Sequence, residues 1–215
     1  MKFVAITQRL VRNKDYPETR DALDVRWAHL AKAAGFIPLP LPTFTDFSCY
    51  PGRIPLAGVI FSGGNDLSRF STDEFSLLRD TFEKGLLDYA VQTRMPVLGV
   101  CRGMQIIADY FGAELTGIPG HVGIRHNVEL TSDSRYLGQS QYVPVQVNSY
   151  HTVGITRLPM VLKECARTAD GQIEAYEHLE LPIVGQMWHP EREETFKEFD
   201  LMTIRRLFNL SGENR

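Results

Sequence analysis

The stretch VLGVCRGMQ, residues 97–105, constrains the fold of this chain more than any other. It begins as an apolar run typical of a buried strand and passes through a glycine–cysteine–glycine turn, G-x-C-x-G. A helical pattern follows at once, with Met104, Ile107, Ala108 and Phe111 repeating at helical spacing. A strand that enters a helix through a tight turn is the repeating unit of parallel α/β sheets.

The first half of the chain repeats this alternation of strand and helix. Strands are expected at 2–7, 36–42, 56–62 and 95–100, and helices at 19–35, about 72–94 and 102–112. Because parallel strands are connected by crossover helices, the pattern predicts an α/β fold with a mostly parallel central sheet flanked by helices. In such a sheet the functional loops follow the carboxyl ends of the strands.

The pattern changes after Gly112. Residues 113–188 contain short apolar runs that indicate strands and hairpins with little helix, and 191–210 is expected to form an amphipathic helix. No repeat and no long linker interrupts the chain. We therefore expect a single domain over residues 1–215.

Bulk properties exclude several classes of function. The chain has 215 residues and a formal net charge of −3, so no overall basic field attracts nucleic acid. No window approaches the roughly 18 apolar residues of a membrane span, and no signal peptide is expected, so a cytoplasmic location is expected. The cysteines, Cys49, Cys101 and Cys165, are sparse and lack a CxxC pair, which argues against a disulfide framework or a zinc site.

Cys101 lies at the centre of the G-x-C-x-G turn. Such a strand–elbow–helix arrangement exposes a nucleophile, and the helix N-terminus favours its thiolate form. The pentapeptide alone is equally compatible with a small buried thiol at a glycine-rich turn. A thiolate nucleophile requires a base, and the base requires a group that orients it.

QMWHPE, residues 186–191, supplies a candidate base and its partner. Pro190 favours an extended conformation at His189, which places His189 and Glu191 on one side of the chain. Taken alone, these residues also fit a histidine at the end of a strand and a glutamate at the start of a helix. Combined with the elbow, the catalytic interpretation is favoured.

FSGGNDL, residues 61–67, ends a strand with two glycines. Neighbouring backbone N–H groups at such a turn form an anion-binding nest. Gly64 and Arg102 are therefore the expected backbone donors of an oxyanion hole. The motif by itself also fits a plain tight turn.

Together these motifs resemble the class I glutamine amidotransferase superfamily, and in particular its γ-glutamyl hydrolase branch, the peptidase C26-like proteins. The resemblance follows the chain in order through SGGND, GVCRGMQ, VNSYH (147–151) and QMWHPE. It implies flavodoxin-like layering around a nucleophile elbow. It also implies a cysteine-dependent enzyme that hydrolyses γ-glutamyl amides through a thioester and needs no cofactor.

The resemblance also implies roles for individual residues. Cys101, His189 and Glu191 would form the catalytic triad, with Gly64 and Arg102 as oxyanion donors. The γ-glutamyl group and its α-amino and α-carboxylate end would be bound by Gly63, Gln105, Asn148, Ser149 and Tyr150.

The leaving group is less constrained. KFVAITQRL and SGGNDL resemble the branch members that release cytidine diphosphoramidate from γ-glutamyl-CDP-amidate for capsule synthesis. Arg9 and Arg12, after the first strand, are the expected phosphate ligands, and Arg102 and Arg125 are further candidates. A γ-glutamyl-aminobutyrate hydrolase, a glutaminase subunit that feeds a separate synthase, and a non-catalytic binding or redox-sensing protein remain alternatives.

Three histidines have no assigned role. His121 and His126 lie five residues apart, but no cysteine or carboxylate pattern joins them, so no metal site is expected. His151 is interpreted as structural. The expected partner is a small γ-glutamyl conjugate, with or without a nucleotide, and no nucleic acid or membrane is expected. The oligomeric state is left open.

Overall fold

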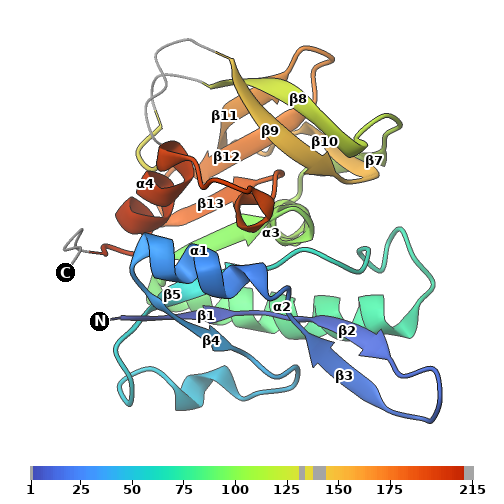
Figure 1. Cartoon of the computed structure of the whole chain (residues 1–215), viewed down its shortest axis with the longest axis vertical. Helices are drawn as coiled ribbons and strands as arrows, with labels where there is room; N and C mark the ends of the chain where they lie inside the picture. Colours follow the sequence, from blue (N-terminus) through green and yellow to red (C-terminus); the bar gives the residue numbers. More distant parts are fainter. Residues whose placement is uncertain (1, 131–133, 138–143, 211–215) are drawn as a thin grey trace.

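The computed structural model describes residues 2–130, 134–137 and 144–210 (Figure 1). Its main feature is a nine-stranded sheet in the order β4-β1-β5-β6-β13-β12-β11-β8-β9. The strands of this sheet are β1 (Phe3–Ile6), β4 (Ile37–Pro40), β5 (Leu56–Phe61), β6 (Val97–Val100), β8 (Val122–Leu130), β9 (Val145–Tyr150), β11 (Leu162–Thr168), β12 (Ile173–His178) and β13 (Ile183–Gln186). The predicted α/β fold with a mostly parallel central sheet is confirmed.

One half of the sheet is parallel. Strands β4, β1, β5, β6 and β13 pair in parallel, and helices cover both faces. The helices are α1 (Arg26–Ala34), α2 (Glu74–Thr93), α3 (Arg102–Tyr110) and α4 (Glu198–Leu207). Residues of α2 and α3 contribute to one hydrophobic core, while residues of α1 and α4 contribute to the other.

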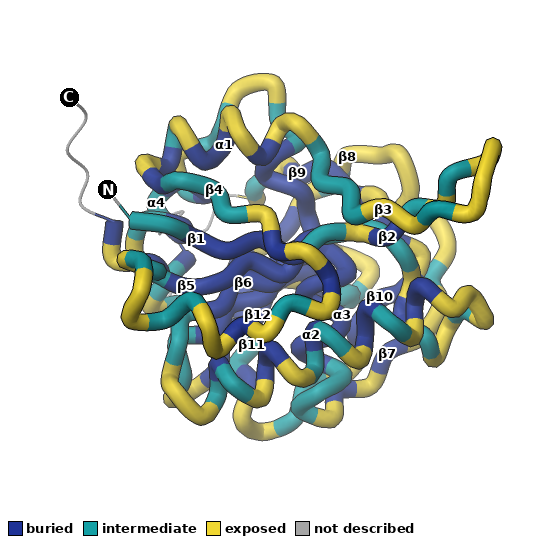
Figure 2. The backbone as a smooth tube through the Cα atoms, turned by 90° about the horizontal axis from the view of Figure 1, so that it is seen from below, coloured by how far each residue is buried: buried dark blue, intermediate teal, exposed yellow. Residues whose placement is uncertain are grey.

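Alternation along the strands divides these two cores. Val59 and Phe61 of β5 face the α2–α3 side, whereas Ile60 faces the α1–α4 side. Figure 2 shows the resulting layer of buried strands at the centre of the molecule. Since the strands are buried on both faces, their sequences are continuous apolar runs, and the strands can therefore be predicted from the sequence.

The other half of the sheet is antiparallel, as the change of pattern after Gly112 predicts. Its four strands β12, β11, β8 and β9 continue the sheet beyond β13. Two small sheets complete the fold: β7 (Glu114–Gly117) with β10 (Val153–Arg157), and β2 (Arg9–Arg12) with β3 (Thr19–Ala22). Short 3₁₀ turns lie at Phe47–Cys49 and Pro190–Arg192.

Two predicted helices are shorter than expected. The helix predicted at 19–35 begins only at Arg26, because residues 19–22 pair with β2 as a hairpin. The tip of this hairpin is exposed in Figure 2, so packing gives little sequence signal there. The helix predicted at 191–210 spans only 198–207. No described helix is both long and apolar enough to cross a membrane.

The long helix α2 begins where the sequence predicts, since the Asp73 side chain accepts a hydrogen bond from the Phe75 N–H. Its buried face combines apolar residues such as Phe75, Leu86 and Leu87 with charged ones. Charged residues Arg79, Asp80 and Glu83 lie on it fully or almost fully buried. A hydrophobic periodicity cannot reveal such a face, because the buried charges are paired with one another.

Candidate active site

Cys101 lies on a strained turn between β6 and α3. Its backbone has φ +53° and ψ −110°, and φ > 0 is uncommon for a residue other than glycine. A Cβ on Gly103 would lie 1.9 Å from the Phe61 carbonyl oxygen, and one on Gly99 would lie 2.6 Å from the Gly103 carbonyl oxygen. Both glycines of G-x-C-x-G are therefore required by close backbone packing, as in a nucleophile elbow.

The elbow places Cys101 at the N-terminus of α3, where the helix dipole stabilises negative charge. Its N–H donates to the Gln186 carbonyl at the end of β13, at 2.9 Å. This bond joins the elbow to the segment that carries the candidate base. The thiol is largely buried, with 7% of the residue exposed.

His189 and Glu191 form a buried pair directly after β13. The His189 Nδ1 lies 2.7 Å from Glu191 Oε1, and each residue is 2% exposed. The extended backbone of His189, φ −104° and ψ 94°, orients both side chains as predicted from the following proline. A Cβ at Gly63 would lie 3.5 Å from both Cys101 Cβ and His189 Nε2, so the two groups meet at this point.

The protonation state of His189 fits this arrangement. Burial lowers its pKa, but the Cys101 and Glu191 side chains outweigh that effect and raise the pKa from 6.5 to about 9. At neutral pH His189 is therefore an imidazolium beside the cysteine. An imidazolium stabilises a neighbouring thiolate and can donate a proton from Nε2.

Two backbone N–H groups beside Cys101 have no hydrogen-bond partner among the described residues. Neither the Gly64 N–H nor the Arg102 N–H donates to a described residue. Gly64 has φ +87°, a conformation that glycine adopts without strain. The two donors predicted for an oxyanion hole are thus free to bind a ligand.

The loop that carries Gly64 is held by Arg79, a residue outside the sequence-based predictions. The buried Arg79 guanidinium donates to the carbonyls of Ser62, Gly63 and Gly64 and pairs with Glu83 at 3.0 Å. Donation to three successive carbonyls fixes the direction in which the loop N–H groups point. The available signal is an Arg–Glu pair at i, i+4 within a helix that otherwise faces the core.

Arg102 extends the same buried network. Its guanidinium bonds to Asp80 and to Glu83, and only 2% of the side chain is exposed. Two arginines and two carboxylates therefore neutralise one another beneath the loop that carries Gly64, here called the oxyanion loop. The expectation that the Arg102 side chain contacts a phosphate does not agree with this structure, because the guanidinium points into the protein.

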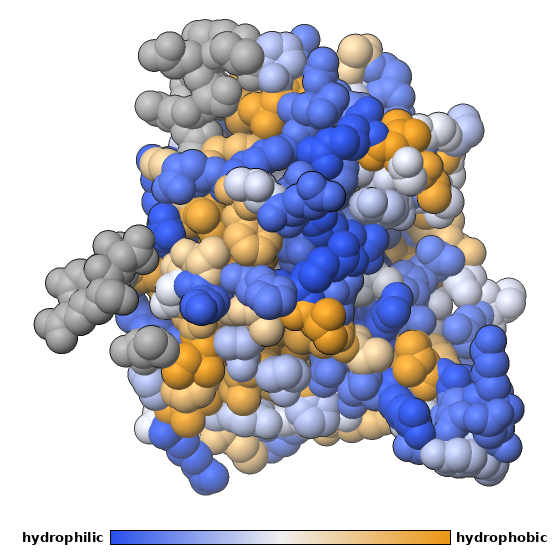
Figure 3. All heavy atoms as spheres, viewed as in Figure 1, coloured by the Kyte–Doolittle hydropathy of each residue, from blue (hydrophilic) through white to orange (hydrophobic). Residues whose placement is uncertain are grey.

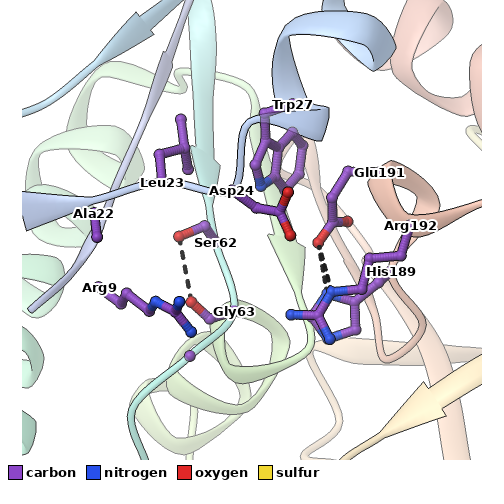
Figure 4. Close-up of a pocket in the computed structure, with 11 residues that line it drawn as sticks. Arg9, Ala22, Leu23, Asp24, Trp27, Ser62, Gly63, His189, Glu191 and Arg192 are labelled. Atoms are coloured by element: carbon purple, nitrogen blue, oxygen red, sulfur yellow. Dashed lines mark hydrogen bonds and ion pairs between the residues drawn. The ribbon is translucent and has the colours of Figure 1, made fainter. Parts of the chain in front are cut away.

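Two pockets share Gly64 in their lining, and Cys101 lines one of them while His189 lines the other. The first, of about 220 Å³, is lined by Cys101, Gln105 and Tyr150. We call it the acyl pocket. The second is smaller, about 30 Å³, and includes His189 and Glu191 together with Arg9 and Arg192, which lie on opposite sides of it in Figure 4. We call it the outer pocket.

The other residues expected to bind substrate divide into two groups. Gln105 and Tyr150 line the acyl pocket, with the Gln105 Nε2 donating to the Val153 carbonyl. Tyr150 is 45% exposed and its ring lies edge-on to His189. Gly63 lines the outer pocket beside the His189 ring.

Asn148 and Ser149 are turned away from both pockets. The Asn148 amide accepts from the His189 N–H at 2.9 Å and donates to the His189 carbonyl at 2.8 Å. The Ser149 hydroxyl donates to the His121 carbonyl at 2.6 Å. Contrary to the expectation that they contact substrate, the structure has Asn148 clamp the His189 backbone and Ser149 hold the strand beneath it.

The expected phosphate-binding arginines also separate. The exposed Arg9 lines the outer pocket, and its guanidinium makes no hydrogen bond or ion pair with a described residue. Arg12 pairs instead with Glu74 at the surface, and Arg125 pairs with Glu193 at 3.0 Å. Arg192 lies outside the sequence-based predictions; its guanidinium stacks on Tyr150, 4.8 Å from the ring centroid.

The histidines without an assigned role lie together. His121, His126 and His151 surround Glu174 of β12. The prediction that no carboxylate joins His121 and His126 is therefore wrong. Glu174 escapes prediction because it lies on a strand far along the chain that becomes adjacent only through the antiparallel sheet.

Comparisons with known proteins agree with this geometry. The model of the Peptidase C26 family matches residues 3–191. The γ-glutamyl-CDP-amidate hydrolase of Campylobacter jejuni is 36% identical over 203 residues, which cover 93% of this chain and 95% of that protein. A component of the glutamine-hydrolyzing GMP synthase of Pyrococcus furiosus is 29% identical over 157 residues, covering 73% and 76% of the two chains.

Solved structures show the same fold. A candidate GMP synthase component from Thermoplasma acidophilum has a TM-score of 0.76 at 20% identity, covering 97% of this chain and 93% of its own. A glutamine amidotransferase from Thermotoga maritima has a TM-score of 0.67 at 17% identity, covering 88% and 76%. The fold is that of the class I glutamine amidotransferases, and the chain belongs to the Peptidase C26 family of cysteine-dependent hydrolases.

Proposed function

We propose that this chain hydrolyses a γ-glutamyl amide through a γ-glutamyl thioester on Cys101. The observation that carries the proposal is the meeting of the elbow cysteine with the buried His189–Glu191 pair, beside two backbone N–H groups without partners among the described residues. Nucleophile, base and base-orienting group are the three parts that acyl transfer requires, and free backbone donors supply the oxyanion hole.

In the first half of the reaction the Cys101 thiolate attacks the γ-carbonyl carbon and forms a C–S bond. The carbonyl oxygen becomes an oxyanion, which the N–H groups of Gly64 and Arg102 stabilise. As the C–N bond breaks, the His189 imidazolium donates its Nε2 proton to the departing nitrogen. The products are the free amine-bearing leaving group and the thioester, with His189 left neutral.

In the second half His189 acts as a base. Its neutral Nε2 accepts a proton from water while the water oxygen attacks the thioester carbon. The C–S bond breaks, glutamate leaves, and the thiolate–imidazolium pair is restored. Glu191, bonded to Nδ1 throughout, keeps the ring oriented and stabilises its charged form.

The two pockets support a division of the substrate. Because His189 protonates the leaving nitrogen, the leaving group must lie on the His189 side, in or across the outer pocket. The glutamyl group then occupies the acyl pocket, between Gln105 and Tyr150. A cavity of about 220 Å³ on that side has room for a glutamyl group and ordered water.

For the leaving group we propose a phosphate bonded to the amide nitrogen, as in γ-glutamyl-CDP-amidate. The outer pocket is too small to enclose a nucleotide, so the diphosphate would lie across its mouth, between Arg9 and Arg192. Arginine binds phosphate oxygens through paired N–H donors. Figure 3 shows a hydrophilic band across this face of the molecule, which suits a charged substrate. The relative from Campylobacter jejuni acts on the same kind of compound.

A direct comparison of substrates tests the proposal. The purified chain is assayed for glutamate release from γ-glutamyl-CDP-amidate, γ-glutamyl-aminobutyrate and glutamine. We expect kcat/KM to be highest for the CDP-amidate by at least about 100-fold, since two charge-assisted contacts each contribute about 1.5–3 kcal/mol. A value no higher than that for glutamine contradicts the nucleotide assignment and favours a glutaminase.

An arginine variant tests the proposed phosphate-bearing leaving group separately from γ-glutamyl amide hydrolysis. Arg9→Ala should raise KM for the CDP-amidate about 10-fold while leaving glutamine hydrolysis nearly unchanged. Arg12→Ala is the matched control, because Arg12 lies on the same strand but pairs with Glu74 outside the pockets. Equal effects of the two variants would remove Arg9 from the proposed phosphate site.

A further inference from the structure

Beside the acyl pocket, whose lining includes His151, three buried side chains and the partly buried His126 converge from different strands. His121 precedes β8, His126 lies within β8, His151 follows β9, and Glu174 lies in β12. Side-chain exposure is 5% for His121, 1% for His151, 0% for Glu174 and 14% for His126. The proposed hydrolysis uses none of them.

The polar atoms of this cluster face one another at short range. Glu174 Oε1 lies 3.3 Å from His151 Nε2 and 3.7 Å from His121 Nδ1, and Glu174 Oε2 lies 3.5 Å from His126 Nε2. None of these five atoms makes a hydrogen bond of normal distance and angle in the described part of the chain. Unsatisfied buried polar atoms cost free energy, so a group of five at one point needs an explanation.

In two of these rings the nitrogen that does not face Glu174, here called the outer nitrogen, already contacts another group. His121 Nε2 lies 2.9 Å from Asp170 Oδ2, and His151 Nδ1 lies 3.0 Å from the Val153 carbonyl oxygen. Each outer nitrogen therefore carries a proton, and in the neutral form of the ring the inner nitrogen has the lone pair. Carboxylate or carbonyl support of the outer nitrogen is the arrangement found behind histidines that bind metal ions.

We propose that His121, His126, His151 and Glu174 bind one divalent zinc ion. Two ligands at 2.0–2.2 Å from a tetrahedral zinc lie about 3.4 Å apart, close to the observed separations between carboxylate and ring nitrogens. Imidazole nitrogen and carboxylate oxygen are ordinary zinc ligands. The ligand atoms of His121, His126 and Glu174 already lie within 4.8 Å of one another.

Hydrogen bonds between the histidines and Glu174 explain the cluster less well than a bound cation does. A single proton could satisfy only one imidazole–carboxylate contact, and the other lone pairs would still repel Glu174. Three imidazolium groups would exceed the two negative charges of Glu174 and Asp170. The separations of 3.3–3.7 Å are also longer than charge-assisted hydrogen bonds. A cation at the centre satisfies all four side chains at once.

The proposed role of the ion is structural. Four protein ligands complete a tetrahedral shell and leave no open position for catalysis. The ion would join β8, β9 and β12 directly behind Tyr150. The Val153 carbonyl accepts hydrogen bonds from both His151 and Gln105, so the same contacts connect the cluster to the wall of the acyl pocket.

Metal content tests the proposal independently of any activity. The full chain, purified without a polyhistidine tag and dialysed, is analysed for all first-row transition metals. We expect about one zinc per chain, reduced at least tenfold in Glu174→Gln. Glu177→Gln is the matched control, since Glu177 lies on the same strand and is 3% exposed but contacts Ser134 and Arg135 instead. It should retain full zinc content.

Two further measurements do not depend on the folding of a core variant. Zinc added to chelator-treated wild-type protein should raise Tm in a concentration-dependent way. Asp170→Ala, at a residue whose side chain is 59% exposed, should weaken zinc binding about tenfold because His121 loses its outer partner. Cys101→Ala should keep full zinc content, which separates this inference from the proposed hydrolysis.

Three results would overturn the proposal. The first is wild-type protein with less than about one tenth of a zinc per chain and no change of Tm on adding zinc. The second is equal loss of zinc from Glu174→Gln and Glu177→Gln. The third is stoichiometric binding of a different metal in place of zinc.

Discussion

The described part of the chain contains two largely buried histidine–carboxylate clusters that differ in how the groups face each other. At the proposed catalytic pair, His189 Nδ1 is in direct hydrogen-bond contact with Glu191, at 2.7 Å. At the second cluster, three histidines face Glu174 at 3.3–3.7 Å without a hydrogen bond. The same residue types are thus arranged in two distinct ways within one chain.

The difference lies in which nitrogen is left free. At His189 the carboxylate engages Nδ1 and leaves Nε2 beside Cys101, where a proton can move. At His121 and His151, Asp170 and a backbone carbonyl engage the outer nitrogens, so the free lone pairs converge on one point. The first arrangement suits proton transfer, and the second suits the binding of a cation.

The variant with the largest expected effect removes a residue of the proposed catalytic pair and leaves the second cluster intact. His189→Ala removes both the acid and the base, so kcat/KM for the γ-glutamyl substrate should fall by about 10⁴-fold or more. Zinc content should not change, because His189 is not part of the second cluster. Steady-state assays and metal analysis on the same preparation check this prediction; loss of zinc together with activity would mean that the two clusters are not independent.

A smaller effect is expected when only the orientation of the ring is disturbed. Glu191→Gln keeps the shape of the side chain but removes the charge that supports the imidazolium, so kcat/KM should fall about 100-fold. The pH at which activity declines should also move below about 9, because Glu191 helps to raise the pKa of His189. Glu194→Gln, at an exposed neighbouring position, should leave both the rate and the pH profile unchanged.

The pH dependence of wild-type activity tests the protonation state of His189 directly. Above about pH 9 His189 loses its proton and can no longer protonate the leaving nitrogen, so kcat/KM should decline with an apparent pKa near 9. The folded-state pKa lies above the ordinary value. The stabilising contribution of this proton is therefore fully present below about pH 6.5 and is lost as the pH rises through about 9. A flat profile to pH 10 would contradict the assignment.

Another buried carboxylate, Asp200, extends the comparison, because no histidine among the described residues forms an ion pair with it. Burial raises its pKa from 3.8 to about 7, although the Trp188 indole donates to Oδ1 at 2.8 Å. The charged form is disfavoured in the fold, so stability falls as the pH rises from about 4 to about 7. Asp200→Asn should raise the free energy of unfolding at pH 8 by about 1–3 kcal/mol and change it little at pH 4, as denaturant titrations can measure.

The parts of the molecule that the sequence predicts are those fixed by local contacts. The G-x-C-x-G turn, its strand and its helix lie within about a dozen residues, and His189 and Glu191 are separated by one proline. Their geometry follows from backbone sterics and hydrophobic periodicity, and both can be read from a short segment of sequence. The parallel half of the sheet is predictable for the same reason.

The remaining parts depend on contacts between distant segments. Arg79 holds the oxyanion loop from a helix, and Asn148 holds His189 across the sheet. Glu174 reaches its histidines only because β12 and β8 both pair with β11. The i, i+4 spacing of Arg79 and Glu83 is also common between surface charges, and Asn148 and Glu174 have no local signal, so their roles appear only when the strands are assembled.

The most direct test of the account is the identity of the covalent intermediate. The enzyme is mixed with its γ-glutamyl substrate, quenched in acid within the first turnover, digested and analysed by mass spectrometry. The account predicts one glutamyl group on the peptide that contains Cys101, absent from Cys101→Ala and from the peptides of Cys49 and Cys165. Glutamate release at the wild-type rate by Cys101→Ala would contradict it.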